Sequence, residues 1–371
     1  MSRTYLDHNA TSPAPEDVID AVTSAMRTVG NASAQHGHGR AAAKIVADAR
    51  EAVGMAMGQC AQDVVFTGSG TEAINTAIWS AVSAGSKHLL VTSMDHPASI
   101  NAAEASGARV TLLPATREGQ ADLDALDAIL AVWDEADGRP FLSIVAANSE
   151  TGVIQDTDRA IDAVQDAGGL VLIDAVQALG KLPMAFPADY VAVSAHKVGG
   201  PQGVGALYVS PDAPFEPLLH GGGQEQRRRA STLNTAGVAG FGAAVSDMAQ
   251  RFSGLRDLRD AFEQRLCAEH PDVVIFGEER PRLDNTTFFS APGLNGMTAM
   301  MQFDLDGISV SNGTACASGK VGESRALRAM GRLDEAPNGA IRVSFGPGNT
   351  MDDVEHALAS FAKQRQRARA A

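Results

Sequence analysis

The sequence is poor in cysteine and in aromatic residues, and it contains no long apolar run. Of its 371 residues, 3 are cysteine and 5% are aromatic. The cysteines are odd in number and lie far apart, at Cys60, Cys267 and Cys316. They therefore do not make a disulfide framework, which indicates a reducing cytoplasm. No segment approaches the roughly 18–20 apolar residues of a membrane span, and the start does not resemble a signal peptide. We expect a cytoplasmic protein with no membrane partner.

An excess of positive charge is also lacking. With 30 Lys and Arg against 44 Asp and Glu, the formal net charge is -14. Binding to the phosphates of a nucleic acid requires clustered basic residues, so no nucleic-acid partner is expected. The composition, 44% hydrophobic and 20% charged, is ordinary for a soluble protein with a sizeable core. The length favours a large domain joined to a smaller one. No metal site is predicted.

Short apolar runs alternate with segments of helical period between residues 63 and 209. Helices are expected over 72–83, 123–133 and 158–166. This alternation is typical of an α/β fold in which helices cover a mostly parallel sheet and ligand-binding groups lie at the carboxyl ends of the strands. Buried strands are predicted at 64–67, 88–91, 110–113, 142–145, 170–173, 190–193 and 205–209.

The pattern changes after Gly222. A long helix is expected over about 236–269, and strands follow near 272–276, 284–289 and 340–344. We interpret this part as a smaller α+β domain to which the N-terminal dozen residues return. The predicted division is a large domain over 13–245 and a small domain over 246–371 together with 1–12.

A lysine follows directly after one of the predicted core strands. Lys197 ends the sequence Ser194-Ala195-His196-Lys197 at the mouth of the sheet, where a buried ammonium group is costly unless it has a function. One such function is a Schiff base with pyridoxal phosphate (PLP), with Ser194 and His196 binding the phosphate. The alternative is a strand-end lysine that reaches solvent.

Two other strand ends carry candidate groups for the same ligand. The turn Gly68-Ser69-Gly70-Thr71 opens a predicted helix, whose N–H groups suit a phosphate together with the Thr71 hydroxyl. An ordinary turn capped by Thr71 is the alternative. Asp174 ends another strand and could keep a pyridine nitrogen protonated, while Gln177 could bond the ring oxygen. Taken alone, Asp174 is better explained as the cap of the next helix.

Three residues elsewhere complete the candidate site. His96 could stack on a cofactor ring, although most such histidines are loop or core residues. Arg342, within an apolar strand, suits bidentate capture of a substrate carboxylate, although a structural ion pair is as common. Cys316 lies in a small, polar, glycine-flanked stretch and is a candidate nucleophile, whereas Cys60 and Cys267 are expected to be packing residues in helical surroundings.

In their order and spacing, these motifs resemble those of the cysteine desulfurases, which belong to the aminotransferase class V branch of the fold type I PLP enzymes. The resemblance runs nearly end to end and includes the segments 5–11, 178–183, 220–225 and 341–346. The Gly-Thr-Ala-Cys-Ala-Ser loop at 313–318 is similar to that of the longer-loop group, which passes persulfide sulfur to iron–sulfur scaffold proteins.

The resemblance implies a fold type I PLP-dependent transferase that acts on L-cysteine as a homodimer and passes sulfur to an acceptor such as an iron–sulfur scaffold. Lys197 would hold PLP, Cys316 would receive the sulfur, and His96 would stack on the ring. Thr232 would reach the phosphate of the partner subunit. The remaining cofactor contacts would come from Gly70, Thr71, Ser149, Asp174, Gln177, Ser194 and His196, and the substrate contacts from Asn31, Asn148 and Arg342.

The chain departs from the family pattern at two places. Ser149 stands where the second of two adjacent asparagines is usual, so either its shorter side chain or Asn148 would take over that contact. Ser231 stands where glycine is usual in Ser-Gly-Thr. Two other functions remain open: another class V PLP enzyme, such as an aminotransferase or a selenocysteine lyase, and a non-catalytic sulfur-relay subunit. The presence of both Lys197 and Cys316 argues against the relay subunit.

Overall fold

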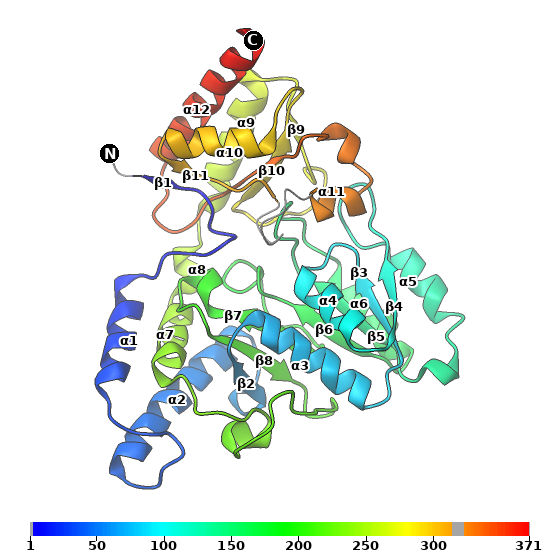
Figure 1. The fold of residues 1–371 in the computed structure, drawn as a ribbon, viewed down its shortest axis with the longest axis vertical. Coiled ribbons are helices and arrows are strands. Elements are labelled where there is room, and N and C mark those ends of the chain that lie inside the picture. The colour runs from blue at the N-terminus through cyan, green and yellow to red at the C-terminus, as the bar shows by residue number, and fades with distance from the viewer. Residues whose placement is uncertain (1–2, 314–322, 371) are drawn as a thin grey trace.

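A seven-stranded sheet forms the centre of the large part of the molecule, which is seen here in a computed structural model that describes residues 3–313 and 323–370 (Figure 1). The strand order is β2-β8-β7-β6-β5-β3-β4. Strand β8 runs antiparallel to both of its neighbours, and the other pairs are parallel. The strands are β2 (Val64–Thr67), β3 (His88–Thr92), β4 (Arg109–Leu113), β5 (Phe141–Val145), β6 (Leu170–Asp174), β7 (Tyr190–Ser194) and β8 (Gly205–Val209).

Helices cover both faces of this sheet, and successive strand residues point to opposite faces because side chains alternate along a strand. Leu89 and Val91 pack with α3 (Gly70–Ser83) and α4 (Pro97–Ala105) on one face. Leu90 packs into the core on the other face. There the helices are α1 (Glu16–Arg27), α2 (Gly37–Ala56), α5 (Leu123–Leu130), α6 (Thr157–Asp166) and α7 (Thr235–Ser246). Burial on two faces explains why these strands are nearly continuous apolar runs.

The C-terminal part builds two small sheets of its own. An antiparallel sheet has the order β12-β10-β9, and β1 of the N-terminus pairs in parallel with β11. The N-terminal strand thus lies against this part of the chain, while the division into domains of 13–245 and 246–371 with 1–12 stays a prediction. The strands are β1 (Thr4–Tyr5), β9 (Val274–Ile275), β10 (Thr286–Ser290), β11 (Ile308–Ser309) and β12 (Ile341–Ser344), and the helices are α10 (Gly296–Leu305), α11 (Arg325–Ala329) and α12 (Met351–Ala370).

Three expectations about local structure were wrong. The single helix over 236–269 is broken into α7, α8 (Met248–Arg251) and α9 (Leu255–Glu269): the chain leaves helical geometry at Asp247 (φ -127°) and again at Gly254, which takes a left-handed φ of 74°. The strand at 110–113 is not buried: β4 is at the edge of the sheet, and Leu112 is 47% exposed. Cys60 is exposed and precedes a short 3-10 turn, so it is not a packing residue. No helix among the described residues is both long and apolar enough to span a membrane.

Candidate active site

A cavity of about 340 Å³ lies at the carboxyl ends of the central strands. Its walls come from the start of α3, from the ends of β6 and β7, and from β12. Parallel strands deliver their carboxyl ends to one edge of the sheet, which is why segments far apart in the sequence meet there. Ten of the predicted residues line it: Gly70, Thr71, His96, Ser149, Asp174, Gln177, Ser194, His196, Lys197 and Arg342.

The start of α3 supplies the phosphate-binding candidate. Ser69 is the N-cap, and its hydroxyl accepts a hydrogen bond from Glu72 N at 3.1 Å. A Cβ on Gly70 would lie 2.8 Å from Val176 Cγ2, so only glycine allows the helix start to lie this close to the turn after β6. The helix N–H groups beyond the cap, with Thr71, face an anion site of the kind that helix N-termini provide. The cap is therefore Ser69 and not Thr71.

Asp174 ends β6 and is 3% exposed. Its Oδ1 accepts a hydrogen bond from Val176 N at 3.0 Å. Burial raises the pKa of this carboxyl, while His96, the Val176 N–H and Lys197 act to lower it. A cationic group in the cavity would favour the ionised carboxylate still further, so Asp174 suits a protonated ring nitrogen.

Lys197 lies in a 3-10 turn, Ala195–Val198, that directly follows β7. Its Nζ donates hydrogen bonds to the backbone oxygens of Asn9 at 2.7 Å and Ala10 at 2.9 Å. Burial lowers the pKa of His196 to about 4, with a further contribution from Lys197, so the imidazole is neutral near pH 7. His196 Nδ1 is buried and has no hydrogen-bond partner among the described residues. A phosphate oxygen would satisfy it.

His96 is fixed from two sides. It is the N-cap of α4, and its Nδ1 accepts a hydrogen bond from Ala98 N at 3.1 Å. The preceding Asp95 is buried and accepts hydrogen bonds from Ser143 Oγ and Val145 N, each at 2.8 Å, and from Thr92 Oγ1. Burial raises the pKa of Asp95 to about 7. Asp95 thus ties the loop that carries His96 to the neighbouring strand β5.

Arg342 enters the cavity from β12 and is 4% exposed. Its guanidinium donates to Ser149 O at 2.9 Å and forms an ion pair with Asp7 at 2.6 Å. The two interpretations of this residue are therefore compatible, because a structural ion pair with Asp7 orients a guanidinium that also lines the cavity.

Three predicted residues among those that the structure describes are not brought to the cavity. Asn148 is buried, but its amide donates to Met94 O and its carbonyl oxygen accepts from the Glu150 and Thr151 N–H groups. Asn31 and Thr232 are both exposed and do not line the cavity. Cys316 lies outside the described residues. Of the two candidates for the missing asparagine, Ser149 is therefore the one that lines the cavity.

Asn9, which was not predicted from the sequence, lines the cavity and contacts Lys197 and Gln177. Its backbone oxygen accepts from Lys197 Nζ and from Gln177 Nε2, the latter at 2.8 Å. Its side-chain Nδ2 donates to Thr286 Oγ1 at 2.9 Å and to Ser149 O at 3.2 Å. The available signal was a polar residue within an N-terminal motif, but only the fold shows that this motif reaches the sheet edge.

Comparison with known proteins decides the family. The family model described as aminotransferase class-V matches residues 4–357. A cysteine desulfurase of Nostoc sp. is 36% identical, and the alignment covers 100% of this chain and 94% of the relative. The chain belongs to the cysteine desulfurases of this family. An IscS-like cysteine desulfurase of Mycobacterium tuberculosis is 34% identical, and the alignment covers 99% of this chain and 97% of the relative. The solved structure of a NifS-like protein from Rickettsia africae superimposes with a TM-score of 0.89 at 29% identity, covering 97% of this chain and 99% of the other.

Cysteine desulfurases depend on PLP and have the type I fold of the PLP enzymes, which this chain shares. The cavity fits that cofactor on three independent grounds. Gly70 and Thr71 place the N-terminus of helix α3, an anion site, in the cavity wall, His196 Nδ1 is buried with no partner among the described residues, and Asp174 is a buried carboxyl group that lines the same cavity. Lys197, which lines the same cavity, is the residue that would hold PLP.

Proposed function

We propose that this protein converts L-cysteine to L-alanine and transfers the sulfur to Cys316 as a persulfide. The observation that carries the proposal is the meeting of Lys197, Asp174 and His96 in one cavity, in a chain whose relatives are named cysteine desulfurases. The reaction balances without a further oxidant. The bond between Cβ and Sγ of the substrate breaks, a bond between Cys316 Sγ and the substrate sulfur forms, and a proton replaces sulfur on the carbon.

Bound PLP supplies an electron sink that makes the α-proton of the amino acid acidic. In the proposal, Lys197 moves that proton and Asp174 keeps the ring nitrogen protonated. Arg342, already held by Asp7, accepts the substrate carboxylate through its planar guanidinium. The Cys316 thiolate attacks the substrate sulfur, and this nucleophilic step separates sulfur transfer from release of alanine.

Several properties extend the proposal beyond the reaction itself. The enzyme acts as a cytoplasmic homodimer in which Thr232 reaches the partner's phosphate site. Support comes from the exposure of Thr232 away from the cavity of its own chain. The large domain comprises 13–245, and the small domain comprises 246–371 with 1–12. The acceptor of the sulfur is a protein such as an iron–sulfur scaffold, as expected for the longer-loop group.

The test is to incubate the purified, PLP-loaded protein with L-cysteine and a thiol reductant and to measure alanine and sulfide. Equal amounts of the two products are expected. Amino-group exchange with a keto acid, without sulfide, would establish an aminotransferase instead. A strong preference for selenocysteine over cysteine would establish a selenocysteine lyase. Absence of all three activities in protein that binds PLP would leave the sulfur-relay subunit.

A further inference from the structure

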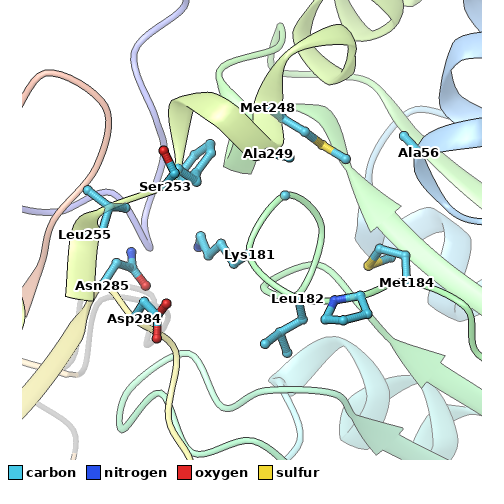
Figure 2. A pocket seen from close by; sticks show the side chains of 13 residues that line it. Ala56, Lys181, Leu182, Met184, Met248, Ala249, Ser253, Leu255, Asp284 and Asn285 are labelled. Atoms are coloured by element: carbon cyan, nitrogen blue, oxygen red, sulfur yellow. The ribbon is translucent and has the colours of Figure 1, made fainter.

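A second partly buried lysine lies next to the candidate active site. Lys181 follows the turn after β6 and faces a cavity of about 480 Å³ whose lining includes Leu182, Met184 and Phe252. Figure 2 shows Lys181 extending toward Asn285, with Leu182 and Met184 on the other side. No ion pair joins Lys181 to a carboxylate among residues 3–313 and 323–370. A partly buried ammonium group without a counter-charge is costly, so its contacts call for an explanation.

Those contacts lead into the active site. Lys181 Nζ donates to Gln177 Oε1 at 3.0 Å and to Asn9 Oδ1 at 3.3 Å. Gln177 Nε2 in turn donates to Asn9 O at 2.8 Å, the same oxygen that accepts from Lys197 Nζ. A chain of hydrogen bonds therefore joins the two lysines through Gln177 and Asn9.

This chain fixes the direction of the Gln177 amide. A lysine ammonium group has donors and no acceptor, so Gln177 must turn its oxygen toward Lys181. Its Nε2 is then the amide end on the side of Asn9 O, which like Gln177 belongs to a residue that lines the cavity. A glutamine with the opposite orientation would present an oxygen to the cofactor and would repel an anionic ring oxygen.

The charge of Lys181 is also coupled to the cavity. Burial, together with the nearby charges of Lys197 and Arg342, lowers the pKa of Lys181 to about 7. An anionic oxygen of a bound cofactor would favour the charged form of Lys181. By the reciprocity of linked equilibria, charged Lys181 would then favour the anionic cofactor.

We propose that Lys181 is a positioning residue that holds the Gln177 amide with its N–H group toward the cofactor and, through Gln177, stabilises negative charge on the cofactor ring. This inference rests on PLP binding at Lys197, but it does not require that the enzyme release sulfide from cysteine. Nothing in the reaction assigned above uses Lys181.

The test is a spectroscopic pH titration of the bound cofactor in the absence of cysteine. Loss of a proton makes the bound chromophore more negative, so removing a nearby cation should raise the pH at which its absorbance changes. For Lys181→Met we expect an upward shift of about one unit, whereas Lys181→Arg, which keeps the charge and the donors, should stay near the wild type. Lys44→Met is the matched control, because Lys44 is exposed and paired with Asp48 at 2.8 Å.

A double-mutant cycle separates positioning from a general loss of structure. If Lys181 acts through Gln177, then Lys181→Met should add little to the shift already caused by Gln177→Ala. Equal shifts in both backgrounds would overturn the proposal, and so would a Lys181→Met titration that matches the wild type. If Lys181→Met does not retain PLP, Lys181→Gln takes its place in the same cycle. Sulfide release by the wild type is measured separately, so failure of the proposed function is distinguished from failure of this inference.

Discussion

The two halves of the candidate site differ in how they are built. The cofactor half consists of Lys197, Asp174, His96 and the start of α3, all held on strand ends of one sheet and lining one cavity. The half expected to handle substrate and sulfur depends on Arg342 from β12, on exposed residues such as Asn31, and on Cys316. The candidate cofactor contacts are therefore gathered at one edge of the central sheet, whereas Arg342 comes from the second sheet, β12-β10-β9, and Asn31 does not line the cavity.

The segment that precedes Thr232 is held in a strained backbone conformation, unlike the strand ends of the cofactor half. Glu225, Gln226 and Arg227 have positive φ angles of 47°, 56° and 67°, and Ser231 has 97°. Conformations of this kind cost of order 1–3 kcal/mol each for residues other than glycine. The Glu225 carboxylate offsets part of this cost, because it is buried against Arg50 and accepts a hydrogen bond from Phe66 N at 2.7 Å.

The largest effect should come from the centre of the cofactor half. Lys197→Ala removes the amine expected to hold PLP and to move the α-proton. Desulfurase activity should fall by at least roughly 1,000-fold, and the absorbance of covalently held cofactor should disappear. Borohydride reduction of the wild type should attach the cofactor to a peptide that contains Lys197. Attachment to Lys181 instead would reverse the roles of the two lysines.

Cys316→Ser should affect only the sulfur half. Sulfide release should fall on the order of 100-fold or more, while PLP retention and the spectral response to L-cysteine persist. Mass spectrometry of wild type exposed to L-cysteine without reductant should find one added sulfur on the peptide containing Cys316. Cys60→Ser is a demanding control, because Cys60 is exposed and its loss should leave turnover unchanged. Normal turnover by Cys316→Ser would return the chain to the generic class V enzymes.

Thr232→Ala tests whether the partner subunit completes the cofactor half. Loss of one hydrogen bond to a charged phosphate costs about 1.5–3 kcal/mol, so PLP retention should weaken roughly 10-fold or more. Mixed dimers locate the effect. When one subunit carries both Thr232→Ala and Lys197→Ala and its partner is wild type, the sole intact lysine site lacks a threonine from across the interface and should retain PLP weakly. A dimer with the two changes on separate subunits should contain one site that has both its lysine and the partner's threonine, and this site should retain PLP normally. Identical PLP retention in the two kinds of dimer would show that Thr232 does not act across the interface.

Asp95 predicts a pH dependence of stability. Its folded pKa of about 7 is raised above the ordinary value of 3.8, so its stabilising effect is complete below the unfolded pKa and is lost as the pH rises through 7. Between pH 5 and 8, the wild type should lose on the order of 1 kcal/mol or more of unfolding free energy relative to Asp95→Asn. Urea unfolding of both proteins across this range measures the difference, and parallel pH profiles would contradict the assignment.

The smallest effect is expected at Ser231. Ser231→Gly should relieve the backbone strain at a φ of 97° and stabilise the protein by about 1 kcal/mol, without a loss of PLP retention. Thermal unfolding measures the gain. Ser253→Gly serves as a control at an exposed serine that has no positive φ; a gain of the same size there would show that local strain is not the cause.

Lys197 and Asp174 could be placed at strand ends from the sequence alone, because Asp174 ends and Lys197 closely follows a continuous apolar run, and such runs are typical of strands buried on both faces. The alternation of strands and helices was predictable for the same reason, since every strand of the central sheet except β4 is buried along its length. The edge position of β4 and the exposure of Cys60 depended on how segments distant in sequence pack, whereas the break at Gly254 is local to its left-handed backbone. The link that Asn9 makes between Lys197 and Lys181 could be seen only in the folded molecule, because these hydrogen bonds join residues 188 and 172 positions apart and leave no trace in local periodicity.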